Sequence, residues 1–364
     1  MRSVSRRAVI AYRAAVLGLT GDQPVPTDVL LEAGVQDHPT GATARLALRL
    51  RGSDTGGALV HSVRAATHLH HRTDAGVLAS ALRIEDAREL AKQSIGPFGA
   101  EIGAGFGAAM DEVAAVMREV MSDGVARTKG ELSAAVSPKV RPELAPWCAG
   151  CGVHHVQDAL FRFASLQAGL SIHVDSGSAS RFVADASFEP VPVDEARASL
   201  VRRFLRLAGP SQPQRLASWL SLTPAAARRW WSLVADELEQ VDVDGRRGWI
   251  HGSDAELLAD PPEPDPLRLI GPFDPLTEFA DREFVVPGPA FRRQVWAPTA
   301  NPGVVVRHGE IIAVWRRRTT KRSLTITVKP FGELPADWRE LAAADAQTIA
   351  RFLGPVDVQL DLAR

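Results

Sequence analysis

The alternation of apolar and polar residues is clearest in the middle of the chain. Residues 194–209 carry Leu, Val and Phe at helical spacing and end in a Gly-Pro pair, which predicts a helix that stops there. A shorter helical pattern covers residues 213–220, and a third begins at Thr223, a favoured cap that is followed by proline. Two strand-like runs then flank Asp244-Gly245, a dipeptide typical of tight hairpin turns. Three helices followed by a hairpin is the order of a winged helix-turn-helix.

The same order of elements recurs upstream. Residues 111–124 have the pattern of an amphipathic helix, and residues 128–137 open with a Thr-x-x-Glu capping box. A third helical pattern covers residues 154–166 and precedes a candidate hairpin over residues 170–184. This order predicts a second winged helix with an insertion before its third helix.

The first 90 residues fit a looser version of this unit. Residues 58–72 read as an extended, wing-like hairpin, and the pattern continues as a helix over residues 84–95. The helical patterns that precede the hairpin cover residues 4–19, 26–35 and 40–52.

The composition changes at DPPEPDP, residues 260–266, a proline-rich acidic stretch that predicts a linker. After it come three strand patterns joined by His308-Gly309 and by the segment RRRTTKR, then a helix over residues 337–354 and a last strand. The fold class expected is therefore α+β, with three tandem winged-helix units before a small β-rich α/β terminal domain. The predicted divisions are a first winged-helix unit with a histidine-rich wing at 1–110, a second with the CxxCxxHH insertion at 111–192, a third at 193–259, and the terminal domain at 267–364.

The overall composition is that of a globular protein, with 45% hydrophobic and 23% charged residues. The net charge of −1 gives no global reason to expect a nucleic-acid partner, so any such argument must rest on local patches. The basic and then apolar N-terminus is interrupted by Arg13 and predicts an amphipathic helix rather than a signal peptide. With no apolar run of membrane-spanning length, we expect a cytoplasmic protein with no membrane partner.

Arginines lie where a winged helix would meet DNA. Arg228 and Arg229 fall on the third helix of the third unit, and Arg246 and Arg247 fall at the tip of its wing. The alternative is a protein-docking module with ordinary surface arginines. A second basic segment in the terminal domain could clamp a duplex backbone or could be a solvated turn that protects a sheet edge. Its residues are Arg316, Arg317, Arg318, Lys321 and Arg322.

Histidines gather in the predicted wing of the first unit. Arg64, His68 and His70 stand out, with His61 and His71 close by, and in a strand His68 and His70 would face the same side. The pattern is compatible with three roles for these histidines: metal binding, a wing that faces DNA phosphates, or the wall of an active site. We expect a functional surface and count Arg64, His68 and His70 among the DNA-binding candidates.

Both cysteines belong to one short motif, so a disulfide framework is not expected. Cys148, Cys151, His154 and His155 form C-x-x-C-x-x-H-H, and paired thiolates at this spacing are half of a common zinc site. A structural site needs four ligands, and the two histidines point in different directions on any regular element. Two alternatives therefore stay open, that the motif binds a structural zinc ion and that it binds no metal. A redox-active cysteine pair is less favoured, because no thioredoxin-like strand precedes the motif.

The segment GVQDH, residues 34–38, ends an apolar run with three polar side chains. Residue types alone favour a turn here. Together with residues 63–82, 269–283 and 314–331, however, the segment resembles the bacterial winged-helix DNA-binding family that includes the AlkZ- and YcaQ-type DNA glycosylases. The resemblance is spread over most of the chain.

This resemblance implies excision of alkylated purines, in some members from interstrand crosslinks. If crosslinks are substrates, we expect an open cleft, because a bulky bridged base cannot enter a closed pocket. It also implies that Gln36 and His38 are the pair that positions or activates the water. The sequence departs from the family pattern, because His38 stands where Gln or Asp is usual. Asp37, at the variable position between them, would stabilise a sugar cation if it faced inward.

The expected function is a DNA glycosylase that needs no cofactor and acts as a monomer on double-stranded DNA in the nucleoid. One alternative is a non-catalytic DNA-binding or transcription regulatory protein. Another is a protein-interaction module with vestigial winged helices.

Overall fold

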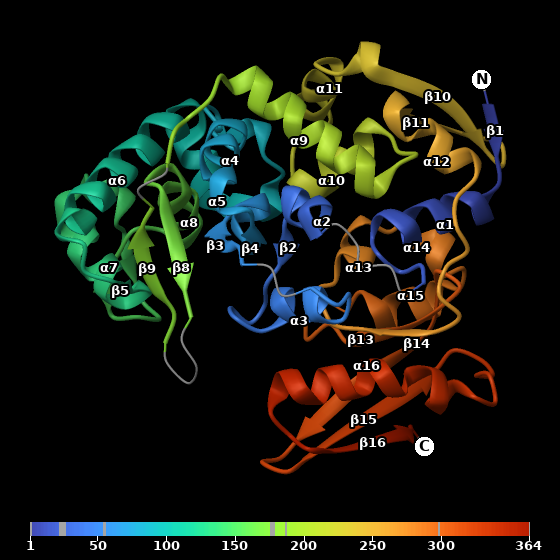
Figure 1. Cartoon of the computed structure of the whole chain (residues 1–364). Coiled ribbons are helices and arrows are strands. Elements are labelled where there is room, and N and C mark those ends of the chain that lie inside the picture. The colour runs from blue at the N-terminus through green and yellow to red at the C-terminus, as the bar shows by residue number, and fades with distance from the viewer. Residues whose placement is uncertain are drawn as a thin grey trace. The chain divides into compact units, whose positions relative to one another are not determined.

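The computed structural model describes residues 2–21, 27–53, 56–174, 179–185, 188–297 and 299–363 (Figure 1). Over these residues the chain has a mixed α+β fold, which confirms the predicted class. It divides into two compact units. The first unit comprises residues 1–55, 204–211 and 237–364, and the second comprises residues 56–203 and 212–236. Among the described residues, no helix combines the length and apolar character that crossing a bilayer requires.

The first unit holds the first 55 residues of the sequence and all of its C-terminal third. Its helices are α1 (Arg6–Val16), α2 (Thr27–Ala33), α3 (Thr43–Arg49), α12 (Ala255–Ala259), α13 (Pro275–Phe279), α14 (Arg282–Val285), α15 (Pro289–Val295) and α16 (Trp338–Leu353). Its strands are β1 (Arg2–Val4), β2 (Val35–Gln36), β10 (Leu238–Val243), β11 (Arg246–His251), β12 (Arg268–Ile270), β13 (Gly303–Arg307), β14 (Glu310–Thr319), β15 (Ser323–Pro330) and β16 (Asp357–Leu362).

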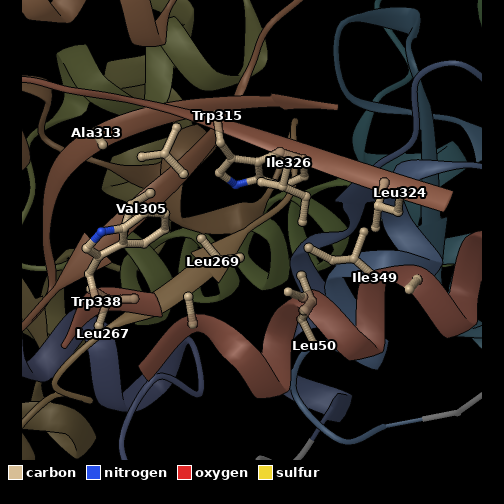
Figure 2. Close-up of a cluster of buried hydrophobic side chains, with 14 of the residues drawn as sticks. Leu50, Leu267, Leu269, Val305, Ala313, Trp315, Leu324, Ile326, Trp338 and Ile349 are labelled. Carbon is tan, nitrogen blue, oxygen red and sulfur yellow. The ribbon is translucent and has the colours of Figure 1, made fainter. Parts of the chain in front are cut away.

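The larger sheet of the first unit has the strand order β12-β13-β14-β15-β16. Only β15 and β16 run parallel. Leu324, Ile326 and Val328 alternate along β15 and are fully buried, as a strand with one covered face requires. They pack with Trp315 of β14 and with Ile349 of α16 in the cluster shown in Figure 2. Helix α16 therefore covers one face of this sheet.

The smaller sheet of the first unit joins β1, β10 and β11. Strands β10 and β11 form an antiparallel hairpin in which Val243 pairs with Arg246. The two residues between them, Asp244 and Gly245, have φ angles of 48° and 83°. These left-handed values are those of the tight turn that the Asp-Gly dipeptide predicts.

The second unit is built from helices on an antiparallel sheet. Its helices are α4 (Ala75–Ala81), α5 (Lys92–Ile102), α6 (Phe106–Val120), α7 (Lys129–Val136), α8 (Asp158–Gln167), α10 (Pro213–Leu220) and α11 (Pro224–Ser232), and α9 (Val193–Ala208) begins here and ends in the first unit. Its strands are β3 (Ala58–His61), β4 (Thr67–His70), β5 (Arg127–Thr128), β6 (Trp147–Cys148), β7 (Val153–His154), β8 (Leu170–His173) and β9 (Arg181–Ala184).

The sheet of the second unit runs in the order β4-β3-β8-β9-β5 with antiparallel neighbours. Helices α6 and α8 pack together, and the rings of Phe106 and Phe163 meet edge to face at 5.7 Å. Helix α7 begins with the predicted capping box, because Thr128 accepts from the backbone of Glu131 while the Glu131 carboxylate accepts from Thr128. The hairpins β3-β4 and β8-β9 confirm the two predicted extended segments, although the tip of the second lies outside the described residues.

The helix expected over residues 84–95 begins only at Lys92, since Ala87–Glu89 form a separate 3-10 turn. Three further element predictions differ from the structure. The helix expected over residues 154–166 starts at Asp158, because the preceding residues form the hairpin β6-β7. Helix α11 ends at Ser232 rather than continuing to residue 240, and β10 has begun by Leu238. The three arginines of RRRTTKR belong to β14, so the turn there is shorter than predicted. In each case a strand pairing outweighs the local helical or turn pattern.

Candidate active site

The Gln36-Asp37-His38 segment connects β2 to α3 in the first unit. Gln36 is half-buried, Asp37 is buried and His38 is exposed. Strand β2 ends at Gln36, and Asp37 and His38 follow it in the turn toward α3. Burial separates the Asp37 side chain from that of His38, which is open to solvent.

The Asp37 carboxylate faces the start of α3 and is only 3% exposed. Its Oδ1 accepts from the backbone N–H groups of Ala42, Thr43 and Ala44 at 3.1, 2.8 and 3.0 Å, and its Oδ2 accepts from that of Gly41. These are N–H groups that the first turn of a helix leaves without an intrahelical partner. The carboxylate therefore fixes the turn between β2 and α3.

Thr43 anchors the backbone on both sides of Asp37. The N–H of His38 donates to Thr43 Oγ1 at 2.9 Å, and the Thr43 hydroxyl donates to the Gln36 carbonyl at 3.2 Å. The main chain that carries the two outer side chains is therefore held at a fixed spacing by one hydroxyl group.

The exposed ring of His38 rests against Phe273. The ring centroids are 5.3 Å apart and the planes make an angle of 72°, an edge-to-face contact. Phe273 has a φ of 58°, a left-handed backbone that is uncommon for an aromatic residue. Such a conformation persists only where the surroundings hold it in place.

A buried ion pair next to Phe273 supplies that constraint. Arg51 meets Asp274 through two contacts of 2.7 and 2.8 Å, and their side chains are 1% and 0% exposed. The Asp274 carboxylate also accepts from the N–H of Leu276, which caps α13. The Arg51 guanidinium donates further to the carbonyls of Ala47 and Leu17. The loop that carries Phe273 is thus tied to α3 and to the end of α1.

The predicted DNA-facing arginines are exposed. Arg228 and Arg229 lie on α11 of the second unit, where Arg229 pairs with Glu89. Arg246 and Arg247 begin β11 of the first unit, and Arg246 lies 3.2 Å from Glu283. Both ion pairs are open to solvent, so each holds its arginine weakly.

The basic segment of the terminal domain is exposed along its whole length. Arg316, Arg317 and Arg318 lie on β14, and Lys321 and Arg322 follow in the turn to β15. Because β-strand side chains alternate, these five residues do not share one face.

The structure goes against a direct DNA contact for two of the three wing residues. His68 and His70 of β4 do face the same side, but both are 0% exposed. His68 lies 3.1 Å from the Ala66 carbonyl, and His70 lies 2.9 Å from Ser62 Oγ. Alternation predicted their common side but not that this side is covered. Arg64 is half-buried and donates to the Trp219 carbonyl at 2.6 Å.

Three of the four predicted metal ligands come together. One ligand atom each from Cys148, Cys151 and His155 lies within 4.8 Å of the others. His154 does not belong to this group, because its ring packs against Trp147 and its Nδ1 lies 3.1 Å from a backbone carbonyl. A hydrogen bond with His155, followed by the backbone N–H of Cys151, lowers the pKa of the Cys148 thiol to about 7.

The amino-acid sequence, taken over nearly its whole length, shows which protein family the chain belongs to. The family model described as DNA glycosylase AlkZ-like matches residues 12–353. The chain belongs to the AlkZ-like DNA glycosylase family. This confirms the resemblance that the sequence motifs indicate.

The chain is similar to a curated protein and to a solved structure, both from Streptomyces sahachiroi. The interstrand DNA cross-link repair glycosylase of Streptomyces sahachiroi is 34% identical over 173 residues, which is 46% of this chain and 46% of that protein. The aligned stretch thus spans about half the length of the curated relative. The solved structure of Streptomyces sahachiroi DNA glycosylase AlkZ has a TM-score of 0.73 at 22% identity, over 99% of this chain and 100% of that one. This likeness shows that the fold is shared.

Sequence reasoning about this AlkZ-like chain missed three residues of the site. Phe273 and Asp274 lie more than 200 positions after Gln36, whereas Arg51 follows it just after the end of α3. One signal was available for Asp274, since Asp before Pro at the start of a helical pattern is a typical cap. No local pattern pairs it with Arg51, which precedes it by 223 residues.

Proposed function

We propose that this chain is a DNA glycosylase that hydrolyses the N-glycosidic bond of N7-alkylated purines, including crosslinked ones. The observation that carries the proposal is the arrangement of the 36–38 segment in a member of the AlkZ-like family. Hydrogen bonds from Asp37 and Thr43 hold in place the backbone that carries Gln36 and His38. An amide and an imidazole held in this way can bind and orient one water molecule.

The proposed reaction needs little help with its leaving group. A purine alkylated at N7 carries a positive charge, so the bond from C1′ to N9 breaks with its electron pair moving to the base. The sugar gains oxocarbenium character, and the water oxygen forms a new bond to C1′. Gln36 orients the water, while His38 accepts its proton and passes it to solvent. Asp37 positions the other two residues, since its oxygens are engaged by the α3 backbone.

No cofactor takes part in this hydrolysis. A zinc ion held by the Cys148–His155 segment would serve the fold, since that segment belongs to the second unit and Gln36 and His38 belong to the first.

The proposed architecture follows the predicted divisions, with winged-helix units at 1–110, 111–192 and 193–259 and a terminal domain at 267–364. The observed order α9, α10, α11, β10, β11 supports the third unit. We propose double-stranded DNA as the partner, and a monomer that acts in the nucleoid.

The arginines and Lys321 of the DNA-binding candidates are proposed to contact phosphates, because all except Arg64 are exposed. His68 and His70 are left out of this set, since burial gives them no surface for DNA. We assign them to the packing of β4.

The test is base release from a duplex that carries a single N7-alkylguanine. Wild-type protein should release the free base and leave an abasic site that alkali cleaves, whereas Gln36→Ala and His38→Ala should lose release and keep DNA binding. Gln359→Ala and His173→Ala are matched controls, because both residues are exposed and stand outside the proposed site. Release that survives both site variants would overturn the mechanism.

A non-catalytic DNA-binding or regulatory protein is the second candidate, favoured by one observation. His38 replaces the Gln or Asp that the resemblance leads us to expect. This candidate predicts steep salt dependence of binding, no base release from any alkylated duplex, and no effect of changing Gln36 or His38. Restored or increased base release in His38→Gln would show that histidine alone limits the chemistry.

A further inference from the structure

The Cys148–His155 segment is a tight hairpin closed by a C-x-x-C-G turn. Strands β6 and β7 pair through Cys148 and Val153, and the N–H groups of Cys151 and Gly152 both donate to the Cys148 carbonyl at 3.2 and 2.8 Å. Gly152 has a φ of 68°, which a side chain would disfavour. The turn therefore brings two sulfur atoms to one side of a compact loop.

The hairpin is too small to hold itself together. Each of its strands has two residues, and an isolated two-stranded hairpin is at best marginally stable in water. Its apolar residues do not compensate, because Trp147 and Val153 are 59% and 51% exposed. The base of the hairpin is anchored, because the N–H of Val156 donates to Ser137 Oγ at 3.1 Å and that of Gln157 donates to the Leu144 carbonyl at 3.3 Å. A metal ion would add a cross-link at the turn that carries the two cysteines.

The imidazole of His155 is prepared for a metal. Its Nδ1 lies 2.8 Å from the Val156 carbonyl, and donation by Nδ1–H to that oxygen leaves Nε2 as the ring nitrogen with a free lone pair. Metal-binding histidines are usually fixed by such a bond from the second nitrogen. A ring nitrogen of His155 lies within 4.8 Å of the sulfur atoms of both Cys148 and Cys151, so the ring faces the sulfur pair.

We infer that Cys148, Cys151 and His155 bind one zinc ion, with a water molecule as the fourth ligand. Zinc bonds of about 2.0–2.3 Å in a tetrahedron place ligand atoms roughly 3.5–4 Å apart. The three atoms already lie within 4.8 Å, so small side-chain rotations complete the site. The ion replaces the two thiol protons, which go to solvent, and two thiolates balance its charge.

The fourth position stays open to solvent. The three ligands line a surface cavity of about 680 Å³, which Lys129 and Asp158 also line. The oxygens of Asp158 are engaged by Lys129 and Arg162, the latter at 2.9 Å. Within the described part of the chain, no further His, Cys, Asp or Glu joins the group of three.

The test uses the full-length, untagged protein, purified under reducing conditions without added metal. Elemental analysis should find about one zinc per chain. His155→Ala and Cys148→Ser should lose it, while His154→Ala, the matched neighbour, should keep it. Cobalt in place of zinc should give thiolate-to-cobalt charge-transfer absorption with tetrahedral ligand-field bands.

Several outcomes would overturn the assignment. They are metal-free wild-type protein that stays metal-free when zinc is added, zinc retained in both Cys148→Ser and His155→Ala, and equal zinc loss in His154→Ala. A Cys148–Cys151 disulfide in protein handled without reductant, with no zinc binding after reduction, would overturn it in favour of a redox pair.

Hydrogen exchange gives a readout that does not depend on those variants folding. Removing zinc from wild-type protein with a chelator should speed exchange in the peptide that covers residues 144–157 and leave α16 unchanged. Unchanged exchange there would contradict the stabilising role. The Gln36→Ala variant should bind zinc normally, so failure of the glycosylase proposal and failure of the zinc proposal are separable.

Discussion

The ring of His38 lies edge-on to that of Phe273, with centroids 5.3 Å apart, although the two residues are more than 200 positions apart in the chain. The first comes from the turn before α3 and the second from a loop that the buried Arg51–Asp274 pair fixes. We therefore predict that Phe273 is a positioning residue for the imidazole and affects the proposed chemistry through His38.

Replacing Phe273 by alanine should lower base release without abolishing it. An edge-to-face contact contributes about 0.5–1.5 kcal/mol, which corresponds to roughly a 2–10-fold slower reaction. Single-turnover kinetics on the alkylated duplex measure the effect, and Phe273→Tyr should restore the rate. If Phe273→Ala changed the rate as much in the His38→Ala background, the contact between the two rings would not be the cause.

Changes at Asp37 separate a positioning role from an electrostatic one. Asp37→Ala removes the acceptor for four backbone N–H groups, so we expect a loss of about 1–3 kcal/mol in the free energy of unfolding together with slower base release. Asp37→Asn can keep Oδ1 and its three bonds, so both losses should be smaller. Urea unfolding and base release are measured side by side.

The opposite result at Asp37 would be informative. If the carboxylate acts on the sugar cation, Asp37→Asn should lose base release by orders of magnitude while its stability changes little. That outcome would contradict the assignment of Asp37 to the α3 backbone.

The parts of the fold that sequence predicts are those set by neighbours along the chain. The Asp244-Gly245 turn and the alternation of Leu324, Ile326 and Val328 follow from backbone preference and side-chain period alone. Their partners lie within a few residues or on the adjacent strand. Backbone preference and side-chain period are therefore enough to predict these two features from the sequence.

The candidate site depends on contacts that no local pattern encodes. The sequence motif places Gln36 and His38 in one segment, but Phe273, Arg51 and Asp274 join it only after folding. The same holds for His68 and His70, whose common side follows from the strand period but whose burial depends on what covers that side. For His154 and His155, spacing alone could not say which ring turns toward the cysteines.

Acid should destabilise the protein through His61 of the second unit. Burial, and then the charges of Arg162 and Lys129, lower the pKa of His61 to about 3, while Asp158 opposes them. In the unfolded chain the pKa is about 6.5. Between these values the unfolded state binds more protons than the folded state, so stability falls as the pH falls, by up to about 1.4 kcal/mol per pH unit.

The measurement is urea unfolding of wild-type protein and His61→Asn between pH 7 and pH 4. Asparagine can keep a hydrogen bond with Ser165, which lies 2.8 Å from the His61 ring, and does not titrate. The stability advantage of the wild type should shrink as the pH falls. The exposed control His173→Asn should follow the wild type, and parallel curves for wild type and His61→Asn would rule out His61 as the source.

The basic hairpin offers a prediction that distinguishes a DNA clamp from a solvated turn. Arg316 and Arg318 pair with Thr327 and Thr325, whereas Arg317 pairs with the buried Ile326. Cross-strand partners share a face, so Arg316 and Arg318 lie on the face opposite to the core that α16 covers. Replacing both by alanine should remove two phosphate contacts. In a plot of the logarithm of the binding constant against the logarithm of the salt concentration, the magnitude of the slope should fall by roughly two.

The control is Arg339→Ala, since that exposed arginine stacks on Trp338 of α16. Unchanged DNA binding, with a new tendency of the double variant to aggregate, would favour the sheet-edge role instead.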